Sequence, residues 1–309
     1  MRYHLIFDFS FLYYKYKFAI ESGRMKRLTY PIEIGGVKIE KDVSQIYYAI
    51  REMEGIRKKL SSKGAEVTVS ICFDSKSKRK EEETEVASEY KANRVSKLNS
   101  FDFDNIAFVK KLLDEAGYNT YKIDGIEADD IVHALVEHYS DKFDDTLIVT
   151  CDLDLAINIK PHVNMYRFKS TSGYGFIMDK NFSEVVGAEL KCNMPYNAVM
   201  LYKCTVGDKS DNIKGINKFG PAAFNKLISY LSTNGYSDWN KLNTYDETKK
   251  VLDNLGGYLK PEQLSQAYES LGLVRPIELT CDEVAFPCNQ SDRDKREAAY
   301  MQLGMQSLV

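Results

Sequence analysis

Glu127, Asp129 and Asp130 place three carboxylates within four residues, directly before the apolar run 131–136. That run is typical of a helix packed against a core, so the acids would lie in its first turn. A helix N-terminus stabilises acidic side chains through its dipole and free N–H groups, and a plain helix start is the simpler interpretation. If residues 127–130 were already helical, Glu127 and Asp130 would share a face and Asp129 would point elsewhere. Acids at other positions favour a metal site instead.

Three further aspartates end apolar segments that have the pattern of buried strands. Asp8, Asp74 and Asp152 close the runs at residues 4–8, 67–74 and 146–152. In open α/β sheets the carboxyl ends of the strands form the edge where ligands bind. Asp154 follows Asp152 by two positions, so an extended backbone would place both side chains on one face. One such aspartate is often only a helix cap, but three of them beside an acidic cluster predict a shared site.

A further acidic pair, Asp208 and Asp211, lies in the segment Gly207-Asp208-Lys209-Ser210-Asp211-Asn212. Converging carboxylates repel one another and take up protons unless cations neutralise them. The four histidines and six cysteines show no zinc-ligand spacing, and ligation by oxygen alone suits Mg²⁺ or Mn²⁺. Two such ions roughly 4 Å apart can clamp the attacking and leaving oxygens of a phosphodiester. The acids therefore predict metal-dependent phosphodiester chemistry.

A glycine-bracketed turn, Gly215–Gly220, follows the last acidic pair and precedes a predicted helix with Pro221 in its first turn. Backbone N–H groups at such a turn and helix N-terminus can hold a phosphate without reading a base. A lone turn of this kind is more often an ordinary helix connection. The adjoining segment Gly207–Asn212 favours the phosphate-binding interpretation.

The elements that must position these residues follow from the apolar periodicity of the chain. Strands alternate with helices, which predicts an α/β fold with a mainly parallel central sheet flanked by helices. Helices are expected at residues 9–20, 42–60 and 103–116, a hairpin at 28–40, and short strands at 118–123, 163–168 and 176–179. The pattern is helical from about residue 181. We expect an α/β core at 1–186 and a helical region at 187–309.

Composition limits the class of protein. The chain has 309 residues, of which 44% are apolar and 28% charged, as in folded soluble proteins. No apolar run approaches the roughly 20 residues of a membrane span, and the strand-like start leaves no room for a signal peptide. Cys72 and Cys151 fall inside the predicted strands as small core residues, and the absence of C-x-x-C pairs indicates a reducing cytoplasm.

The net charge of −3 does not by itself suggest nucleic-acid binding, but the charges are unevenly placed. Residues 76–97 hold seven basic and five acidic side chains, and residues 203–226 hold five lysines against two aspartates. Acids gathered in one pocket could therefore conceal basic binding surfaces.

Taken in order, the motifs resemble those of the flap endonuclease and 5′→3′ exonuclease superfamily. The chain is most similar to the phage and bacterial enzymes, including phage RNase H and the 5′-nuclease domain of DNA polymerase I. The residues that carry the resemblance are Phe7-Asp8, Phe73-Asp74, Tyr90-Lys91-Ala92-Asn93-Arg94, Glu127-Ala128-Asp129-Asp130, Cys151-Asp152-Leu153-Asp154 and Gly207-Asp208-Lys209-Ser210-Asp211-Asn212-Ile213, then the glycine turn. They span most of residues 5–227, and the ordered set is highly specific.

The resemblance implies nine acidic metal ligands, all of which are present. The first metal would be held by Asp8, Asp74, Glu127 and Asp129. The second would be held, directly or through water, by Asp130, Asp152, Asp154, Asp208 and Asp211. This division places Asp129 with the first metal, whereas the helical-face argument favoured Asp130. The two agree if the helix starts only after Asp129.

The resemblance also implies two elements that contact the nucleic acid. The charged stretch of about residues 76–100 would form a helical arch, with Lys91 and Arg94 facing the scissile phosphate and Tyr90 stacking on a base. Four glutamates at 81, 82, 83 and 85 make this arch less basic than is usual. A helix–three-turn–helix element at about 203–230 would grip duplex backbone and bind K⁺. Its contact residues are predicted to be Lys214, Gly215, Ile216, Lys218, Gly220 and Lys226.

The expected protein is a structure-specific 5′-nuclease of a PIN-like fold that uses two Mg²⁺ or Mn²⁺ ions. Its substrate would be DNA with a 5′ flap or 5′ end, or an RNA–DNA hybrid, in replication or repair. It is expected to be monomeric and cytoplasmic, in a bacterial or phage-infected cell, with replication proteins as partners and no membrane. Two alternatives remain: a PIN-type ribonuclease, for which the glycine turn has no role, and a non-catalytic DNA-binding accessory protein, which would lack metal ligands.

Overall fold

The computed structural model describes the whole chain except residues 35–36, 76–99, 287–291 and 306–307. The described residues form two compact units. The first unit comprises residues 1–75, 100–151 and 278–309, and the second comprises residues 152–277. The expected boundary near residue 186 lies within the second unit, and residues 278–309 return to the first unit.

The first unit is built on a parallel sheet. Its strands are β1 (Arg2–Asp8), β4 (Glu66–Cys72), β5 (Asn119–Tyr121) and β6 (Asp145–Thr150), in the spatial order β5-β4-β1-β6. The register pairs Asp8 with Cys72 and Phe7 with Val149, so these strands end at one edge. The residues of β1 from His4 to Asp8 are all buried, as expected for a strand covered on both faces. The prediction of a mainly parallel sheet flanked by helices is confirmed.

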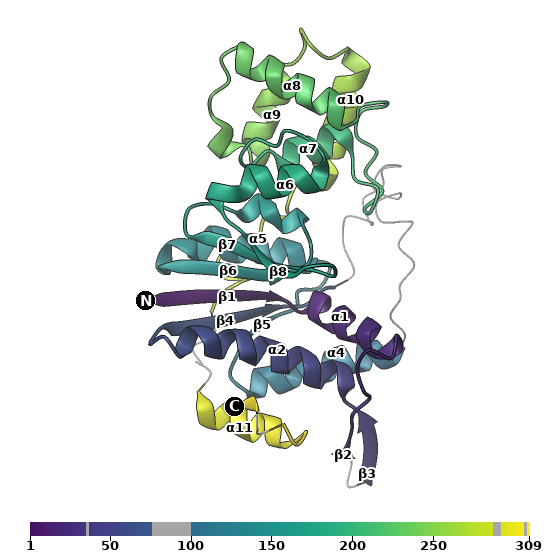
Figure 1. Cartoon of the computed structure of the whole chain (residues 1–309), viewed down its shortest axis with the longest axis vertical. Helices are drawn as coiled ribbons and strands as arrows, with labels where there is room; N and C mark the ends of the chain where they lie inside the picture. The colour runs from purple at the N-terminus through teal and green to yellow at the C-terminus, as the bar shows by residue number, and fades with distance from the viewer. Residues whose placement is uncertain (35–36, 76–99, 287–291, 306–307) are drawn as a thin grey trace. The chain divides into compact units, whose positions relative to one another are not determined.

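Helices cover the sheet of the first unit (Figure 1). They are α1 (Phe9–Glu21), α2 (Ser44–Ser61), α4 (Ser100–Glu115) and α5 (Ala128–Tyr139). The first unit also contains the 3₁₀ turn η2 (Ser140–Lys142) and the helix α11 (Arg293–Met301). The helix α1 begins directly after β1 because Asp8 caps it: the backbone N–H of Phe11 donates to Asp8 Oδ1 at 3.1 Å. The strands β2 (Thr29–Ile34) and β3 (Val37–Asp42) pair antiparallel, which confirms the predicted hairpin.

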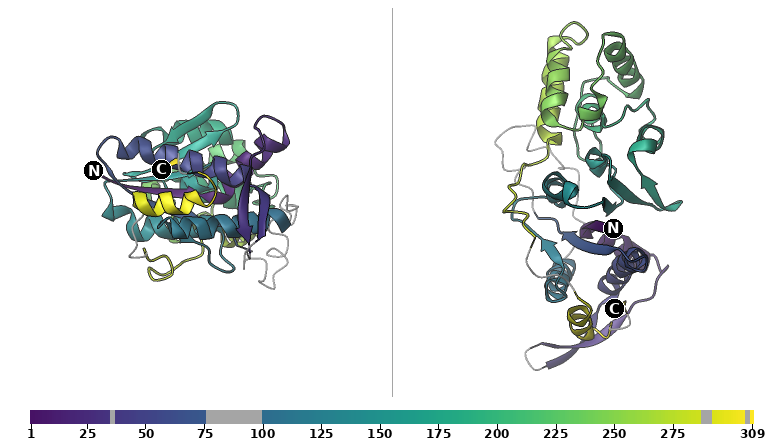
Figure 2. Two further views of the ribbon diagram at one scale, coloured as in Figure 1. Left: turned by 90° about the horizontal axis from the view of Figure 1, so that it is seen from below. Right: turned by 90° about the vertical axis from the view of Figure 1, so that its left-hand side faces the viewer.

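The helix α11 fastens the end of the chain to the first unit. It packs against α4 (Figure 2), and Tyr300 Oη donates to Glu54 Oε1 at 2.8 Å. Glu54 is also bonded by Tyr118 and by Arg57, the latter at 2.8 Å, so this buried carboxylate is fully surrounded by donors. A buried charge with such partners is tolerated in a protein interior.

The second unit is mainly helical. It contains η3 (Asp154–Asn158), β7 (Val163–Lys169), β8 (Gly173–Ile177), η4 (Asp179–Asn181), α6 (Phe182–Leu190), α7 (Val199–Val206), α8 (Pro221–Thr233), η5 (Trp239–Lys241), α9 (Tyr245–Asp253) and α10 (Pro261–Val274). The strands β7 and β8 form an antiparallel pair. The short helix α7 is contacted by α8, α9 and α10 and is therefore the centre of this unit. The helix α8 begins with Pro221 at its first position, as predicted.

Two expectations about the strands are wrong in detail. The strands β4 and β6 end at Cys72 and Thr150, so Asp74 and Asp152 lie two residues beyond them, in the loops. Cys151 is consequently exposed and is no core residue, whereas Cys72 is buried as expected. None of the helices in the described part of the chain combines the length and apolar character that a bilayer span requires.

A buried histidine gives the first unit a pH-dependent stability. His4 is fully buried, its Nε2 lies 2.8 Å from Ser70 Oγ, and its ring stacks on Phe143 at 4.8 Å. Burial lowers the pKa of His4 from 6.5 to about 3. The unfolded chain therefore binds a proton near pH 6.5 that the folded chain refuses until about pH 3.

We expect His4→Gln to flatten the pH dependence of stability below pH 6.5. In the wild type, stability is lost as the pH falls through the unfolded pKa, by about 2 kcal/mol between pH 7 and pH 5. The variant has no such group, so its free energy of unfolding should fall by about 2 kcal/mol less over that interval. Urea denaturation at pH 7 and pH 5 measures both changes. Equal losses in the two proteins would contradict a neutral buried imidazole.

Candidate metal centre and adjoining turn

In the first unit, Asp8 is held rigidly at the end of β1. Its Oδ1 caps α1, and its Oδ2 accepts a hydrogen bond from Thr150 Oγ1 at 2.9 Å, at the end of the neighbouring strand β6. The side chain is only 7% exposed. The helix-cap interpretation and the metal-ligand prediction therefore coexist in one residue, because the cap uses one oxygen and leaves the carboxylate charge in place.

Asp74 joins the loop after β4 to the start of α5. Its Oδ1 accepts from the backbone N–H of Ala128 at 2.9 Å. Glu127 is the N-cap of α5, with extended φ and ψ of −79° and 155°, and the helix starts at Ala128. Glu127 is therefore outside the helix, so the argument that it shares a helical face with Asp130 does not apply. The helix also does not start after Asp129, which was the other possibility, because Ala128 is already its first residue.

Three acids of the first unit lie near enough to the buried thiol of Cys72 to affect it electrostatically. Burial raises its pKa well above the usual value, and the negative charges of Asp8, Asp129 and Asp74 raise it further. Three carboxylates from three elements thus gather around the carboxyl end of β4. Asp130 is buried, with 2% of its surface exposed, while Asp129 is partly exposed. The assignment of Asp129 to the first metal with Asp8 and Asp74 stays a prediction.

In the second unit, Asp154, Asp208 and Asp211 form a compact acidic cluster. Each offers one carboxylate oxygen, and the three oxygens lie within 4.8 Å of one another. Asp211 is buried, and the other two are partly buried. A set of three carboxylates at this spacing has the donor chemistry that hard divalent cations prefer, so these residues fit Mg²⁺ or Mn²⁺.

Asp152 lies near this cluster, where burial and neighbouring negative charge disfavour its ionised form. Burial and the charge of Asp154 raise its pKa to about 6. The expected extended backbone between the two residues is wrong: Leu153 has helical φ and ψ of −72° and −19°, and Asp154 opens the turn η3. The backbone N–H of Asp154 donates to Asp152 Oδ1 at 2.9 Å, so Asp152 also caps this turn.

A closed loop presents Asp208 and Asp211. The backbones of Asp208 and Ile213 exchange two hydrogen bonds of 2.8 Å, and Ser210 Oγ donates to Asp208 Oδ1 at 2.6 Å. Gly207 precedes the loop at φ +89°, where a Cβ would lie 2.5 Å from the carbonyl oxygen of Ile213. Glycine is therefore required at this position, because both its φ and the close backbone approach exclude a side chain.

Lys203 is a residue of this site that the sequence analysis missed. It lies on α7 with only 9% of its surface exposed, and its Nζ forms ion pairs with Asp154 and, at 2.7 Å, with Asp208. Although burial raises the pKa of Asp208, the Lys203 charge and hydrogen bonds lower it to about 2. The available signal was one lysine among apolar residues of a helix, five positions before Asp208.

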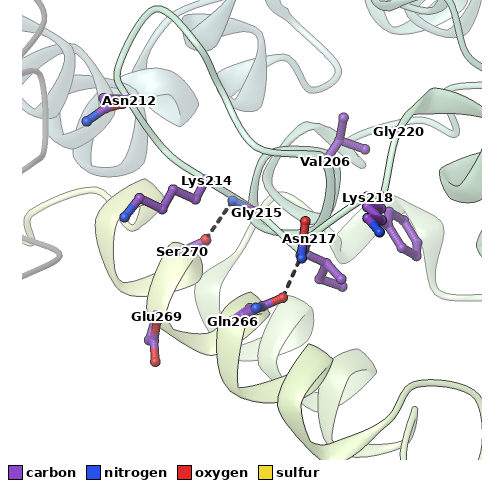
Figure 3. Close-up of a pocket in the computed structure, with 12 residues that line it drawn as sticks. Val206, Asn212, Lys214, Gly215, Asn217, Lys218, Gly220, Gln266, Glu269 and Ser270 are labelled. Carbon is purple, nitrogen blue, oxygen red and sulfur yellow. Dashed lines mark hydrogen bonds between the residues drawn. The ribbon is translucent and has the colours of Figure 1, made fainter.

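The glycine turn adjoins the cluster and lines a cavity of about 750 Å³ (Figure 3). Lys214, Asn217, Lys218 and Gly220 line it from the turn, and Gln266, Glu269 and Ser270 from α10. Figure 3 shows Gln266 and Ser270 pointing from α10 toward the turn. Lys214 and Lys218 are exposed, as is Lys226 on α8, whereas Gly215 and Ile216 are buried.

Three N–H groups at the start of the turn are engaged within the protein. Gly215 N–H donates to Ser270 Oγ at 3.1 Å and Asn217 N–H to Gln266 Oε1 at 2.9 Å. Ile216 N–H donates to the carbonyl of Thr205 at 2.8 Å. These three donors are therefore not available to a phosphate. Contact of Gly215, Ile216 and Gly220 with nucleic acid stays a prediction.

Tyr90, Lys91 and Arg94, and the arch to which they were assigned, lie outside the described residues. Of the nine expected metal ligands, three from the first unit gather near Cys72, and three from the second form the cluster of Asp154, Asp208 and Asp211. Glu127 and Asp130 flank the first group in the chain, and Asp152 borders the second. The metal assignments of these acids stay predictions.

Comparison with known proteins places this site in a family. Residues 5–187 match the model of the 5′-3′ exonuclease, N-terminal resolvase-like domain. A 5′-3′ exonuclease of Buchnera aphidicola is 29% identical over 222 residues, which cover 71% of this chain and 73% of the relative. DNA polymerase I of Bacillus caldotenax is 26% identical over 227 residues, covering 73% of this chain but only 24% of the polymerase.

Solved structures share the fold. The 5′-exonuclease of T5 with bound zinc superposes with a TM-score of 0.59 at 17% identity, covering 99% of this chain and 96% of that one. The catalytic core of Rad2 in complex with a DNA substrate gives a TM-score of 0.53 at 17% identity, covering 98% and 90%. The family match extends over more than half of the 309 residues and includes Asp8, Asp74 and Asp154. The chain belongs to the 5′-3′ exonuclease family.

Proposed function

We propose that this protein is a divalent-metal-dependent 5′-nuclease that hydrolyses phosphodiesters near a 5′ end or at the base of a 5′ flap. The observation that carries the proposal is the cluster of Asp154, Asp208 and Asp211, whose carboxylate oxygens lie within 4.8 Å of one another beside a lysine-flanked turn. Family membership supports the same reaction. The substrate would be DNA, or an RNA–DNA hybrid during primer removal, in replication or repair.

Two groups of acids would each hold one metal ion. Asp8, Asp74, Glu127 and Asp129 are assigned to the first metal, and Asp130, Asp152, Asp154, Asp208 and Asp211 to the second. When bound, Mg²⁺ or Mn²⁺ would stabilise negative charge on the reacting phosphate and make an attacking water more acidic. The protein's own part is to fix the carboxylates: Asp8 through its two bonds at the end of β1, and Asp208 through Ser210 and the closed loop.

Other residues are assigned to substrate contact. Lys91 and Arg94 would stabilise charge on the scissile phosphate, and Tyr90 would stack on a base. Lys214, Lys218 and Lys226 would hold the duplex backbone around the turn Gly215–Gly220, where a K⁺ ion is also proposed. Since the N–H groups of residues 215–217 are engaged, the lysines supply the contacts that depend on charge. We further propose a monomer that works in the cytoplasm with replication proteins.

The lysines of the turn give a quantitative prediction. Lys214→Ala combined with Lys218→Ala should weaken binding to duplex-bearing flaps of every sequence, because phosphate contacts carry no sequence information. The slope of log K against log salt should become shallower by about two units, roughly one for each lost phosphate contact. A salt titration of flap affinity in Ca²⁺ measures this.

The matched control for the turn is Lys249→Ala combined with Lys250→Ala on α9. These lysines are also exposed and form local ion pairs with Asp253 and Glu247. The control removes the same charge from the same unit and should keep the wild-type slope. If both double variants made the salt dependence of binding equally shallow, the lysines of the turn would have no special part in binding.

One assay tests the proposed function against its alternatives. Three substrates are compared: a labelled 5′-flap duplex, a flush duplex with a labelled 5′ end, and a single-stranded RNA of matching sequence. Each is incubated with Mg²⁺, Mn²⁺ or EDTA. A 5′-nuclease cleaves the first two only with Mg²⁺ or Mn²⁺. Cleavage of the single-stranded RNA alone would indicate a PIN-type ribonuclease. Flap binding without cleavage in either Mg²⁺ or Mn²⁺ would indicate a non-catalytic DNA-binding protein.

A further inference from the structure

The feature with the furthest consequence is the buried side chain of Lys203. Lysine is among the residues least often buried, because its ammonium loses its hydration shell in the interior. Here it is 9% exposed, between the buried neighbours Tyr202 and Cys204 on α7. The interior position is stable only because acidic partners replace the lost water.

Those partners belong to the candidate metal centre. The ammonium forms ion pairs with Asp154 and with Asp208, the latter at 2.7 Å. Both carboxylates are members of the cluster that fits a divalent cation. Lys203 therefore places a positive charge where a cation bound to these acids would also have to lie.

The Lys203 ammonium and a divalent ion cannot both bind these carboxylate oxygens without weakening each other's binding. Like charges a few ångströms apart in a partly buried site repel strongly, and each carboxylate has a limited number of lone pairs. Lysine carries its charge on a flexible four-carbon stem, so its ammonium can move away from a carboxylate while the backbone of α7 stays in place.

We propose that Lys203 is an internal cation that competes with the divalent ion for Asp154 and Asp208. Without metal, Lys203 offsets part of the negative charge of the cluster and holds Asp154 and Asp208 together. With metal, its ammonium leaves at least one of the two carboxylates. The competition weakens metal binding at this site and makes it an exchange of one cation for another. This inference rests on the proposed metal-dependent function and adds a residue that tunes its metal affinity.

The alternative is that ammonium and metal reside together, with Lys203 only orienting the two carboxylates. The two models predict different changes in metal affinity when the ammonium is removed. Under competition, removing the ammonium tightens metal binding. Under co-residence, removing it leaves the carboxylates less well ordered and weakens metal binding or leaves it unchanged.

The first experiment compares Mn²⁺ binding by calorimetry in the wild type, Lys203→Met and Lys203→Arg. Methionine replaces the stem of lysine with an unbranched apolar chain and removes the charged ammonium. At least one Mn²⁺ dissociation constant should fall about tenfold or more in Lys203→Met, the effect of removing one nearby like charge. Lys203→Arg keeps the charge and should bind Mn²⁺ like the wild type. Unchanged or weaker binding in Lys203→Met would overturn the proposal.

A matched control separates the local contact from net charge. Lys209→Met removes the same charge one residue after Asp208, from an exposed side chain. Its Mn²⁺ dissociation constants should change less than threefold, because an exposed charge is screened by solvent. A gain in affinity equal to that of Lys203→Met would mean that only the general field of the protein matters, and would refute the specific role of Lys203.

A second experiment uses the wild-type chain, so it does not depend on how the variants fold. An amine-reactive acetylating reagent is applied with and without saturating Ca²⁺, and the modification of Lys203 is followed by mass spectrometry. Displacement predicts at least a threefold faster reaction at Lys203 when Ca²⁺ is present. Equal or slower reaction would overturn the proposal. Absence of Mn²⁺ binding to every variant would instead refute the metal centre itself, which separates this failure from that of Lys203.

Discussion

Replacing Asp211 by asparagine is expected to lower Mg²⁺-dependent cleavage of a 5′-flap duplex by about 100-fold or more. Asp211 is 5% exposed, and its carboxylate oxygen lies within 4.8 Å of those of Asp154 and Asp208. Asparagine keeps the size of the side chain but removes the negative charge that would hold a cation. Single-turnover cleavage with enzyme in excess measures the loss at the reacting phosphate without a contribution from product release.

The control for this substitution is Asp253→Asn in the same unit. Asp253 is an exposed acid at the end of α9 that pairs with Lys249 at 3.0 Å. It should cleave at close to the wild-type rate. If Asp211→Asn kept its rate within threefold of wild type while remaining folded, the acidic cluster of the second unit would not be the catalytic metal centre.

Gly215→Ala is expected to destabilise the second unit by about 3 kcal/mol and to weaken flap binding with it. Gly215 has φ +62°, and a Cβ there would lie 2.4 Å from the backbone nitrogen of Gly207. The left-handed backbone costs an alanine roughly 1–2 kcal/mol, and forcing atoms into a packed position costs roughly 1–3 kcal/mol more. The contact joins the turn to the loop that carries Asp208, so both should be displaced.

A second glycine in the same unit isolates the steric part of this effect. Gly235 also has a positive φ, +85°, but no atom lies within 4 Å of the place where its Cβ would stand. Gly235→Ala should therefore cost only the backbone strain of roughly 1–2 kcal/mol. Urea unfolding of the two variants, together with flap affinity in Ca²⁺, gives the comparison. Equal destabilisation of the two variants would mean that the close contact between Gly215 and Gly207 adds nothing to the cost of the substitution.

The strands and the acids that follow them were predictable because each carries its own local signal. An apolar run such as residues 4–7 has the pattern of a buried strand, and an aspartate directly after it is visible without knowledge of the fold. Parallel pairing then brings strand ends together, which is why Asp8 and Asp74 could be assigned to one edge. The hairpin around residues 28–40 was predictable for the same reason.

Other features depend on contacts between distant residues and have no local signal. The engagement of Gly215 and Asn217 by α10 joins residues about 50 positions apart. The burial of Lys203 reflects its place on α7 opposite Asp154 and Asp208, whereas its neighbours in the sequence only indicate an apolar helix. A turn at Leu153 stands in place of the expected extended backbone between Asp152 and Asp154. Asp152 accepts a hydrogen bond from the N–H of Asp154, and such local caps compete with extended backbone.

The return of residues 278–309 to the first unit bears on the order in which the protein folds during synthesis. The described part of the second unit is one continuous segment, residues 152–277, so all of it has been synthesised before residues 278–309 follow. The first unit has to wait for α11, because Tyr300 supplies a hydrogen bond to the buried Glu54 of α2. Domains usually mature from the N-terminus onward during translation. In this chain the sheet that begins the sequence is the last part to acquire all of its contacts.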